Sequence, residues 1–109
     1  MKRGDLVVVA LPGDYGKPRP ALIVQADLFN ETHASITIVP VTSTLVDAPL
    51  FRLTVEPSQE NGLRSLSQLM VDKVTTVSRA RIAQTIGRLE DHLVLRVSRA
   101  LALWVGIAT

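Results

Sequence analysis

The chain has 109 residues and carries 12 Lys and Arg against 10 Asp and Glu, a net charge of +2 at pH 7. This length predicts a single domain over residues 1–109, and the weak positive charge favours anionic partners without making a polybasic tail. The absence of cysteine excludes disulfides, thiolate metal sites and cysteine nucleophiles. Neither a membrane-spanning apolar run nor a signal region is present, so we expect a cytoplasmic protein without membrane contact.

Most of the chain predicts short strands separated by turns. The first apolar run, residues 6–11, is β-branched and does not alternate, so both of its faces are expected to be covered. The first loop, residues 12–16, contains two glycines. We predict strands at residues 6–11, 20–25, 35–41, 50–55, 65–71, 74–77 and 85–89, a helical turn at 26–31 and a short turn at 78–82.

One convincing helix is predicted at the end of the chain. Asp91 is a fair N-cap and Gly106 is a typical stop. The spacing of the apolar residues predicts one buried face made of Leu93, Val97, Ala100, Leu101 and Trp104. Many short strands followed by one helix indicate a mainly β protein, with a small, strongly curved sheet or barrel and a helix packed against it.

The sequence contains no standard catalytic motif. It has no Gly-rich phosphate loop, no HExxH and no nucleophile elbow, and no ligand cluster for a metal. His33 and His92 are expected to be solvated. The most distinctive residue is Arg19, which two prolines hold on a stiff extended segment, a favourable arrangement for meeting a phosphate.

Further polar residues interrupt or end the predicted strands. Taken singly, each of these residues is more often structural than functional. They are Thr42, Ser43, Gln68, Asp72, Lys73, Thr75 and Thr76.

Six short segments give these residues a common context. They are RGDLV at 3–7, GKPRPALIV at 16–24, VPVTS at 39–43, NGL at 61–63, MVDKVTTV at 70–77 and IGRL at 86–89. In order and spacing they resemble the MazF/PemK/Kid toxins of type II toxin–antitoxin systems, across nearly the whole chain. No single segment is highly specific.

The resemblance implies a CcdB/PemK-like fold related to SH3-like barrels: a small, twisted, partly closed antiparallel sheet with a C-terminal helix, usually in a homodimer. It also implies an mRNA interferase, a sequence-selective endoribonuclease that cuts single-stranded RNA without metal or cofactor. The expected partner is a cognate antitoxin, MazE-like or another small DNA-binding protein, which blocks the toxin and carries the complex to operator DNA.

The resemblance also assigns roles to residues. The RNA 2′-hydroxyl would attack the phosphorus, leaving a 2′,3′-cyclic phosphate and a 5′-hydroxyl. Arg19 would fork the phosphoryl oxygens, Thr42 would hold the phosphate, and Asp72 would act as base if burial raised its pKa. Aromatic residues are 4% of the chain, too few for a stacking platform. The expected RNA-binding residues are Tyr15, Lys17, Ser43, Gln68, Lys73, Thr75 and Thr76.

Three positions depart from the family pattern. Met70 stands where some members carry arginine, Thr75 stands where many carry arginine before the residue matching Thr76, and Lys73 replaces a common glutamine. The acid that protonates the leaving group is therefore unassigned, and a weak enzyme or a binding module without cleavage stays open.

A CcdB-like gyrase poison is the other alternative with this fold. Such chains end in Trp-Gly-Ile, whereas here Val105 interrupts the tripeptide after Trp104 and two residues follow Ile107. The internal segments favour the nuclease family.

Overall fold

A computed structural model describes residues 1–11, 13 and 17–109. It confirms the seven expected strands, the early helical turn and the C-terminal helix. The elements in chain order are β1 (Asp5–Ala10), β2 (Pro18–Ile23), α1 (Asp27–Asn30), β3 (Ser35–Thr42), β4 (Arg52–Val55), β5 (Ser67–Met70), η1 (Val71–Lys73), β6 (Thr75–Ser78), η2 (Arg79–Arg81), β7 (Ile82–Arg88) and α2 (Asp91–Trp104).

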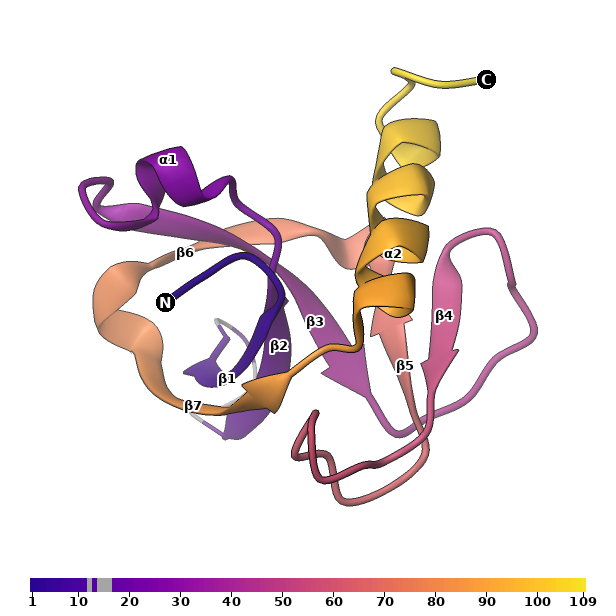
Figure 1. Ribbon diagram of the computed structural model, residues 1–109, viewed down its shortest axis with the longest axis horizontal. Coiled ribbons are helices and arrows are strands. Elements are labelled where there is room, and N and C mark those ends of the chain that lie inside the picture. Colours follow the sequence, from indigo (N-terminus) through magenta and orange to yellow (C-terminus); the bar gives the residue numbers. More distant parts are fainter. Residues whose placement is uncertain (12, 14–16) are drawn as a thin grey trace.

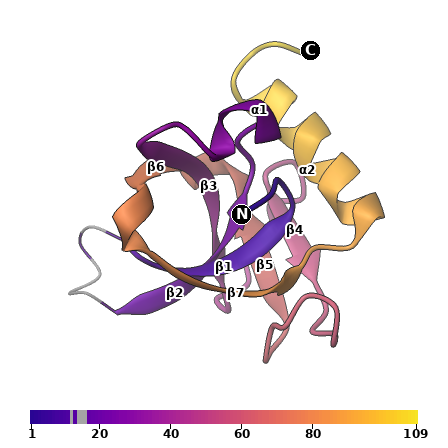
Figure 2. The ribbon, with the colours of Figure 1, turned by 60° about the vertical axis from the view of Figure 1, so that its left-hand side comes forward.

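The strands form one antiparallel sheet in the order β4-β5-β3-β2-β1-β7, with β6 paired to β3 beside β5. The sheet curls strongly, and η2 carries the chain from β6 to β7 along the curl (Figure 2). α2 stands beside β4 and β5 (Figure 1). The sheet does not close, so the fold is a curled open sheet with a C-terminal helix, as the mainly β prediction required.

Two apolar cores lie on the two faces of the sheet. Leu6 belongs to the core that α2 covers, together with Leu22 and Val97. Val7 and Val9 belong to the core inside the curl. Successive side chains of a strand point to opposite faces, so the continuous apolar run of β1 feeds both cores. This confirms the expectation that the first strand is covered on both sides.

α2 differs from its prediction at both ends. Asp91 is the first helical residue rather than the cap, and Glu90 occupies the N-cap position without a side-chain cap bond. The Glu90 carboxylate instead accepts hydrogen bonds from Asn61 and Ser58. At the other end Trp104 is 48% exposed and packs its ring against Phe51, with the ring centroids 5.5 Å apart.

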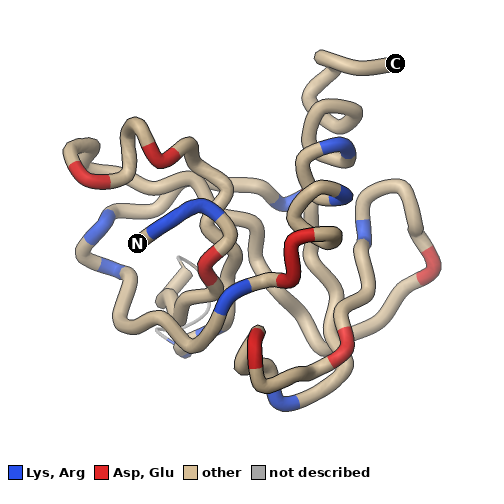
Figure 3. The backbone as a smooth tube through the Cα atoms, in the orientation of Figure 1, with Lys and Arg blue, Asp and Glu red and all other residues tan. Residues whose placement is uncertain are grey.

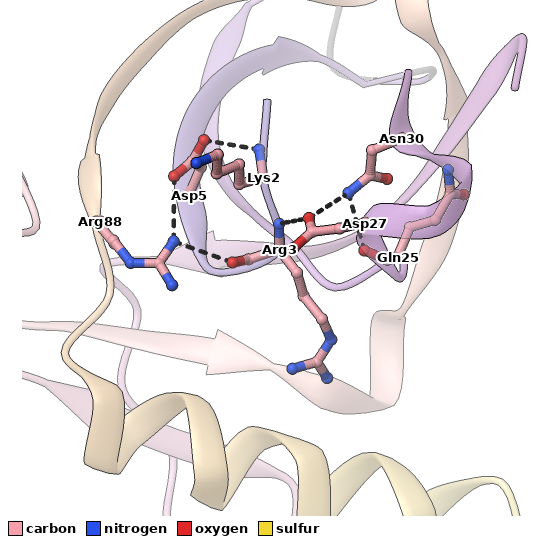
Figure 4. A network of polar contacts seen from close by, with 7 residues as sticks. All are labelled: Lys2, Arg3, Asp5, Gln25, Asp27, Asn30 and Arg88. Atoms are coloured by element: carbon pink, nitrogen blue, oxygen red, sulfur yellow. Dashed lines mark hydrogen bonds and ion pairs between the residues drawn. The ribbon is translucent and has the colours of Figure 1, made fainter. Parts of the chain in front are cut away.

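Residues 3–7, the first of the six segments that carry the family resemblance, connect three parts of the fold. The Arg3 backbone N–H donates to Asp27 Oδ1 at 2.7 Å and thereby lowers the pKa of that carboxyl. Arg88 Nη1 donates to the Arg3 carbonyl at 3.0 Å and lies 3.4 Å from Asp5 Oδ1. Figure 4 shows how these contacts join the start of β1 to α1 and to the end of β7.

Candidate functional site

A cleft opens where β2 and β3 separate. The two strands pair from Ile23 and Ile38 up to Ala21 and Pro40, and the pairing stops there. Pro20 has no N–H to donate toward β3, so it cannot extend the ladder across this gap. Beyond it β2 continues to pair with β1 alone, because Pro20 faces Val8 and Arg19 faces Val9.

Two adjoining hollows occupy this gap, with volumes of about 520 and 280 Å³. Arg19, Val41 and Thr42 line both of them. Ser43 lines the larger hollow, and Met70 lines the smaller one. The structure therefore brings together three predicted residues, Arg19, Thr42 and Ser43, that lie far apart in the sequence. The larger hollow is called the cleft below.

Arg19 lies in the middle of Pro18–Ile23 and is exposed. Its two proline neighbours fix the local backbone, which limits the directions in which its guanidinium can point. A planar guanidinium can hold two oxygens of a phosphate at once.

Thr42 ends β3 and is half-buried, while Ser43 after it is exposed. Thr42 Oγ1 accepts a hydrogen bond from the Thr44 backbone N–H at 3.1 Å. A threonine hydroxyl keeps its own hydrogen to donate after accepting such a bond. The turn thus fixes the hydroxyl while leaving it able to bind an anionic oxygen.

Gln68 was predicted to contact RNA, but its side chain is 5% exposed and already engaged. Gln68 Oε1 accepts from the Val46 N–H at 3.1 Å, and Gln68 Nε2 donates to the Val46 carbonyl at 2.9 Å. These two hydrogen bonds fix the position of Val46, in the segment that follows Ser43 and Thr44. Gln68 lines neither hollow of the described chain, and its predicted contact with RNA stays a prediction.

Asp72 forms a two-point ion pair with Arg52, which the sequence had not indicated. Arg52 Nε and Nη2 lie 2.7 and 3.1 Å from the two Asp72 carboxylate oxygens. The hydrogen bonds from Arg52 lower the pKa of Asp72 below its usual value, against the effect of burial. The predicted role as base requires a raised pKa, and this geometry shifts it the other way. The role of Asp72 as base stays a prediction that the ion pair disfavours.

The ion pair makes a testable statement about pH. A lowered folded-state pKa adds stability above the unfolded-state pKa, and that stability is lost as the pH falls through the folded value. We expect Asp72→Asn to lower the free energy of unfolding by about 1–2 kcal/mol at pH 7. The difference should hold down to about pH 5 and shrink below the ordinary pKa of 3.8.

Urea unfolding of both proteins between pH 7 and pH 3 would measure this difference. A constant difference across that range would contradict the ion-pair explanation. RNA cleavage by the same variant at pH 7 separates the two roles, since loss of a general base costs about 10²–10⁴-fold in rate.

The remaining predicted RNA-binding residues do not line either hollow of the described chain. Lys17 is exposed just before β2, and Lys73 is exposed in η1. Thr75 and Thr76 are exposed on β6, and the Thr76 hydroxyl lies 3.3 Å from that of Thr37. Tyr15 lies outside the described residues.

Sequence reasoning missed four polar residues that line the cleft, Arg64, Ser65, Ser67 and Gln84. Arg64 follows the Asn61-Gly62 turn, and Gln84 lies on β7 opposite Val8. The turn signal pointed to that loop, but nothing in the sequence showed that the loop folds back against β7.

Both histidines are exposed, as expected. Within residues 1–11, 13 and 17–109, no three His, Asp or Glu side chains gather closely enough to hold a metal ion. In the same part of the chain, no helix has the length and apolar character to cross a membrane.

Comparison with known proteins gives consistent matches over almost the entire chain. The family described as PemK-like, MazF-like toxin of type II toxin–antitoxin system matches residues 2–105. A relative from Mycolicibacterium smegmatis, named probable endoribonuclease MazF, is 49% identical over 109 residues, which cover 99% of each chain.

Solved structures agree in fold at lower identity. A mycobacterial endoribonuclease in complex with its cognate antitoxin superposes with a TM-score of 0.84 at 21% identity, covering 100% of this chain and 98% of the other. A MazE–MazF structure from Deinococcus radiodurans gives a TM-score of 0.81 at 22% identity, covering 99% and 97%.

Proposed function

This chain belongs to the PemK-like, MazF-like toxins of type II toxin–antitoxin systems and is an endoribonuclease of the MazF type, and we propose that it cuts single-stranded RNA through attack of the 2′-hydroxyl, without a metal ion. The products would be a 2′,3′-cyclic phosphate and a 5′-hydroxyl. The observation that carries the proposal is the meeting of Arg19 and Thr42 at the gap between β2 and β3.

The proposed chemistry needs two things from these residues. As the 2′-oxygen attacks, negative charge grows on the two non-bridging phosphoryl oxygens, and Arg19 donates to them as a fork. The Thr42 hydroxyl donates to the same phosphate and fixes its orientation for in-line attack. Donors that are held in place before the reaction need no reorganisation when the charge develops, which is why they lower the barrier.

Proton transfer is assigned less completely. Asp72 is the candidate base that the family pattern indicates, and its pairing with Arg52 holds its pKa low. Met70, in the smaller hollow, offers no proton at the place where some relatives have arginine. The low pKa of Asp72 and the apolar side chain of Met70 together favour a second candidate function, a binding module that holds RNA without cutting it.

Incubation of the purified protein with a long single-stranded RNA in excess EDTA tests the proposal. We expect discrete fragments whose 5′ ends accept phosphate from a polynucleotide kinase without prior dephosphorylation, because the leaving 5′-oxygen ends as a hydroxyl. A parallel reaction with Mg²⁺ in place of EDTA is the control. Fragments that form only with Mg²⁺, or that carry 5′-phosphates, would contradict the mechanism. Binding without fragments would support the binding module.

The proposed partners follow from the family and from exposed apolar surface. Around the end of α2, the exposed fractions of Leu103, Val105 and Ile107 are 42%, 57% and 82%. Leu50, which lines the same hollow as Leu103, is 68% exposed. Such a surface favours protein contacts. We propose a cognate antitoxin as one partner and a second copy of the chain as another, with action on RNA in the cytoplasm. Operator binding through the antitoxin stays a prediction.

A further inference from the structure

The cleft has a second arginine on the wall opposite Arg19. Arg19 comes from β2, whereas Arg64 comes from the loop between β4 and β5. A row of cross-strand neighbours, Pro20, Val8 and Gln84, lies between them and forms the floor. Neighbouring strands are about 4.8 Å apart, so this row spans about 10 Å, well beyond one phosphate group.

The loop that carries Arg64 is held rigidly. Asn61 is fully buried, and its Oδ1 accepts from the backbone N–H groups of Ser58 and Leu63, both at 3.0 Å. Its Nδ2 donates to the Glu56 carbonyl at 2.9 Å and to Glu90 Oε1 at 3.1 Å. The backbone position of Arg64, three residues later, is therefore set before any ligand arrives, which reduces the entropy lost by the loop on binding.

The same loop packs backbone against backbone on β7. The Arg88 N–H donates to the Glu60 carbonyl at 2.8 Å. A Cβ atom at Gly87 would lie 2.4 Å from the Asn61 carbonyl carbon, so the two segments touch without side chains between them. This contact fixes the width of the cleft between the loop and the strand that carries Gln84.

Most arginines of the fold form hydrogen bonds or ion pairs with the protein, and Arg64 differs from them. Arg52 pairs with Asp72, Arg79 donates to the Asn30 and His33 carbonyls, and Arg88 donates to the Arg3 carbonyl. Arg64 is exposed and has no hydrogen bond or ion pair within the described chain.

The β4–β5 loop carries acidic positions as well as this basic one (Figure 3). Glu56 and Glu60 are exposed residues of the loop, but neither lines the cleft, whereas Arg64 does. The side chains that the loop turns toward the cleft are therefore not acidic.

We propose that Arg64 binds a second phosphate of the RNA strand, one adjacent to the phosphate held by Arg19. The intervening nucleotide then lies over Pro20, Val8 and Gln84, where the Gln84 amide can reach the edge of a base. This inference rests on the proposed RNA cleavage and names a further binding residue of that site. Arg64 makes a contact that is the same in the ground state and the transition state, so it contributes to affinity rather than to the chemical step.

The test compares Arg64→Gln with the unaltered protein and with Arg96→Gln, an exposed arginine of α2 outside the cleft. The cleavage position is first mapped on an RNA that the unaltered protein cuts. Affinity is then measured over a range of salt with the same RNA carrying a 2′-deoxynucleotide at that position, which removes the nucleophile.

For Arg64→Gln we expect an affinity about tenfold weaker, KM raised by a similar factor and kcat within about twofold. The slope of log K against log salt should fall by about 0.7, the value for one phosphate contact on a single strand. Arg64→Lys should recover the slope, because it restores the charge, but only part of the affinity. Arg96→Gln should change none of these quantities.

The two failures are distinguishable. Normal cleavage by the unaltered protein, together with an unchanged salt slope and KM in Arg64→Gln, would overturn the role of Arg64 and leave the proposed function intact. A fall in kcat alone would also overturn it. An unaltered protein that neither binds nor cuts single-stranded RNA would overturn both proposals.

Discussion

Replacing Arg19 with glutamine is expected to lower kcat for RNA cleavage by about 10²–10³-fold. Glutamine keeps a hydrogen-bond donor and much of the side-chain length, but it loses the positive charge and the forked geometry. Arg19 is exposed and belongs to neither apolar core. Single-turnover cleavage at saturating protein measures the chemical step directly.

Two comparisons make this result specific. Arg19→Lys keeps the charge without the fork, so its rate should fall between those of the glutamine variant and the unaltered protein. Arg99→Gln, on the exposed face of α2, should cut at the normal rate. An equal loss in the Arg19 and Arg99 variants would show a general effect of charge, and a normal rate in Arg19→Gln would remove Arg19 from the mechanism.

Gly62→Ala is expected to destabilise the protein by about 3 kcal/mol or more. Gly62 has φ +71°, a conformation that side chains disfavour, and a Cβ there would lie 2.0 Å from the Ile86 carbonyl oxygen. Backbone atoms of β7 cannot move aside as a flexible side chain would, so the loop must separate from the strand. Urea unfolding followed by circular dichroism measures the loss.

Gly106→Ala is the matched control for this substitution. Gly106 has φ +82°, but nothing lies within 4 Å of the position its Cβ would take. Gly106→Ala should therefore lower the free energy of unfolding only by the cost of the positive φ, about 1 kcal/mol. A similar loss in both variants would mean that the close approach of the loop to β7 contributes nothing. A partly folded Gly62→Ala protein should also lose affinity for RNA, since the displaced loop carries Arg64.

The positions of the strands followed from local pattern, but their ends did not. β2 begins at Pro18, two residues before its predicted start, because β1 offers a pairing edge to Pro18 and Arg19. β5 begins only at Ser67, since the preceding residues bend around the clamp formed by Asn61. The first difference depends on pairing with a neighbouring strand and the second on a buried side chain that holds the loop, and the spacing of apolar residues registers neither.

For the site too, local features could be predicted from the sequence, whereas contacts between segments could not. The proline neighbours of Arg19 and the position of Thr42 at a strand end are local features, and the resemblance linked them. The partner of Asp72 was not predictable, because Arg52 comes from the adjacent strand, where it faces Met70 in the register. The approach of Arg64 and the use of Gln68 to hold Val46 likewise arise only when strands and loops pack together.

Pro20, at the separation of β2 and β3, has a consequence for solubility. Strand ends that part from one another leave backbone groups available to any extended segment of another molecule, which is a route to aggregation. A site that must stay open for a ligand cannot be covered to prevent this. Pro20 removes an N–H group with which an intruding strand would register, so the opening stays accessible to a ligand while resisting edge-to-edge association with other chains.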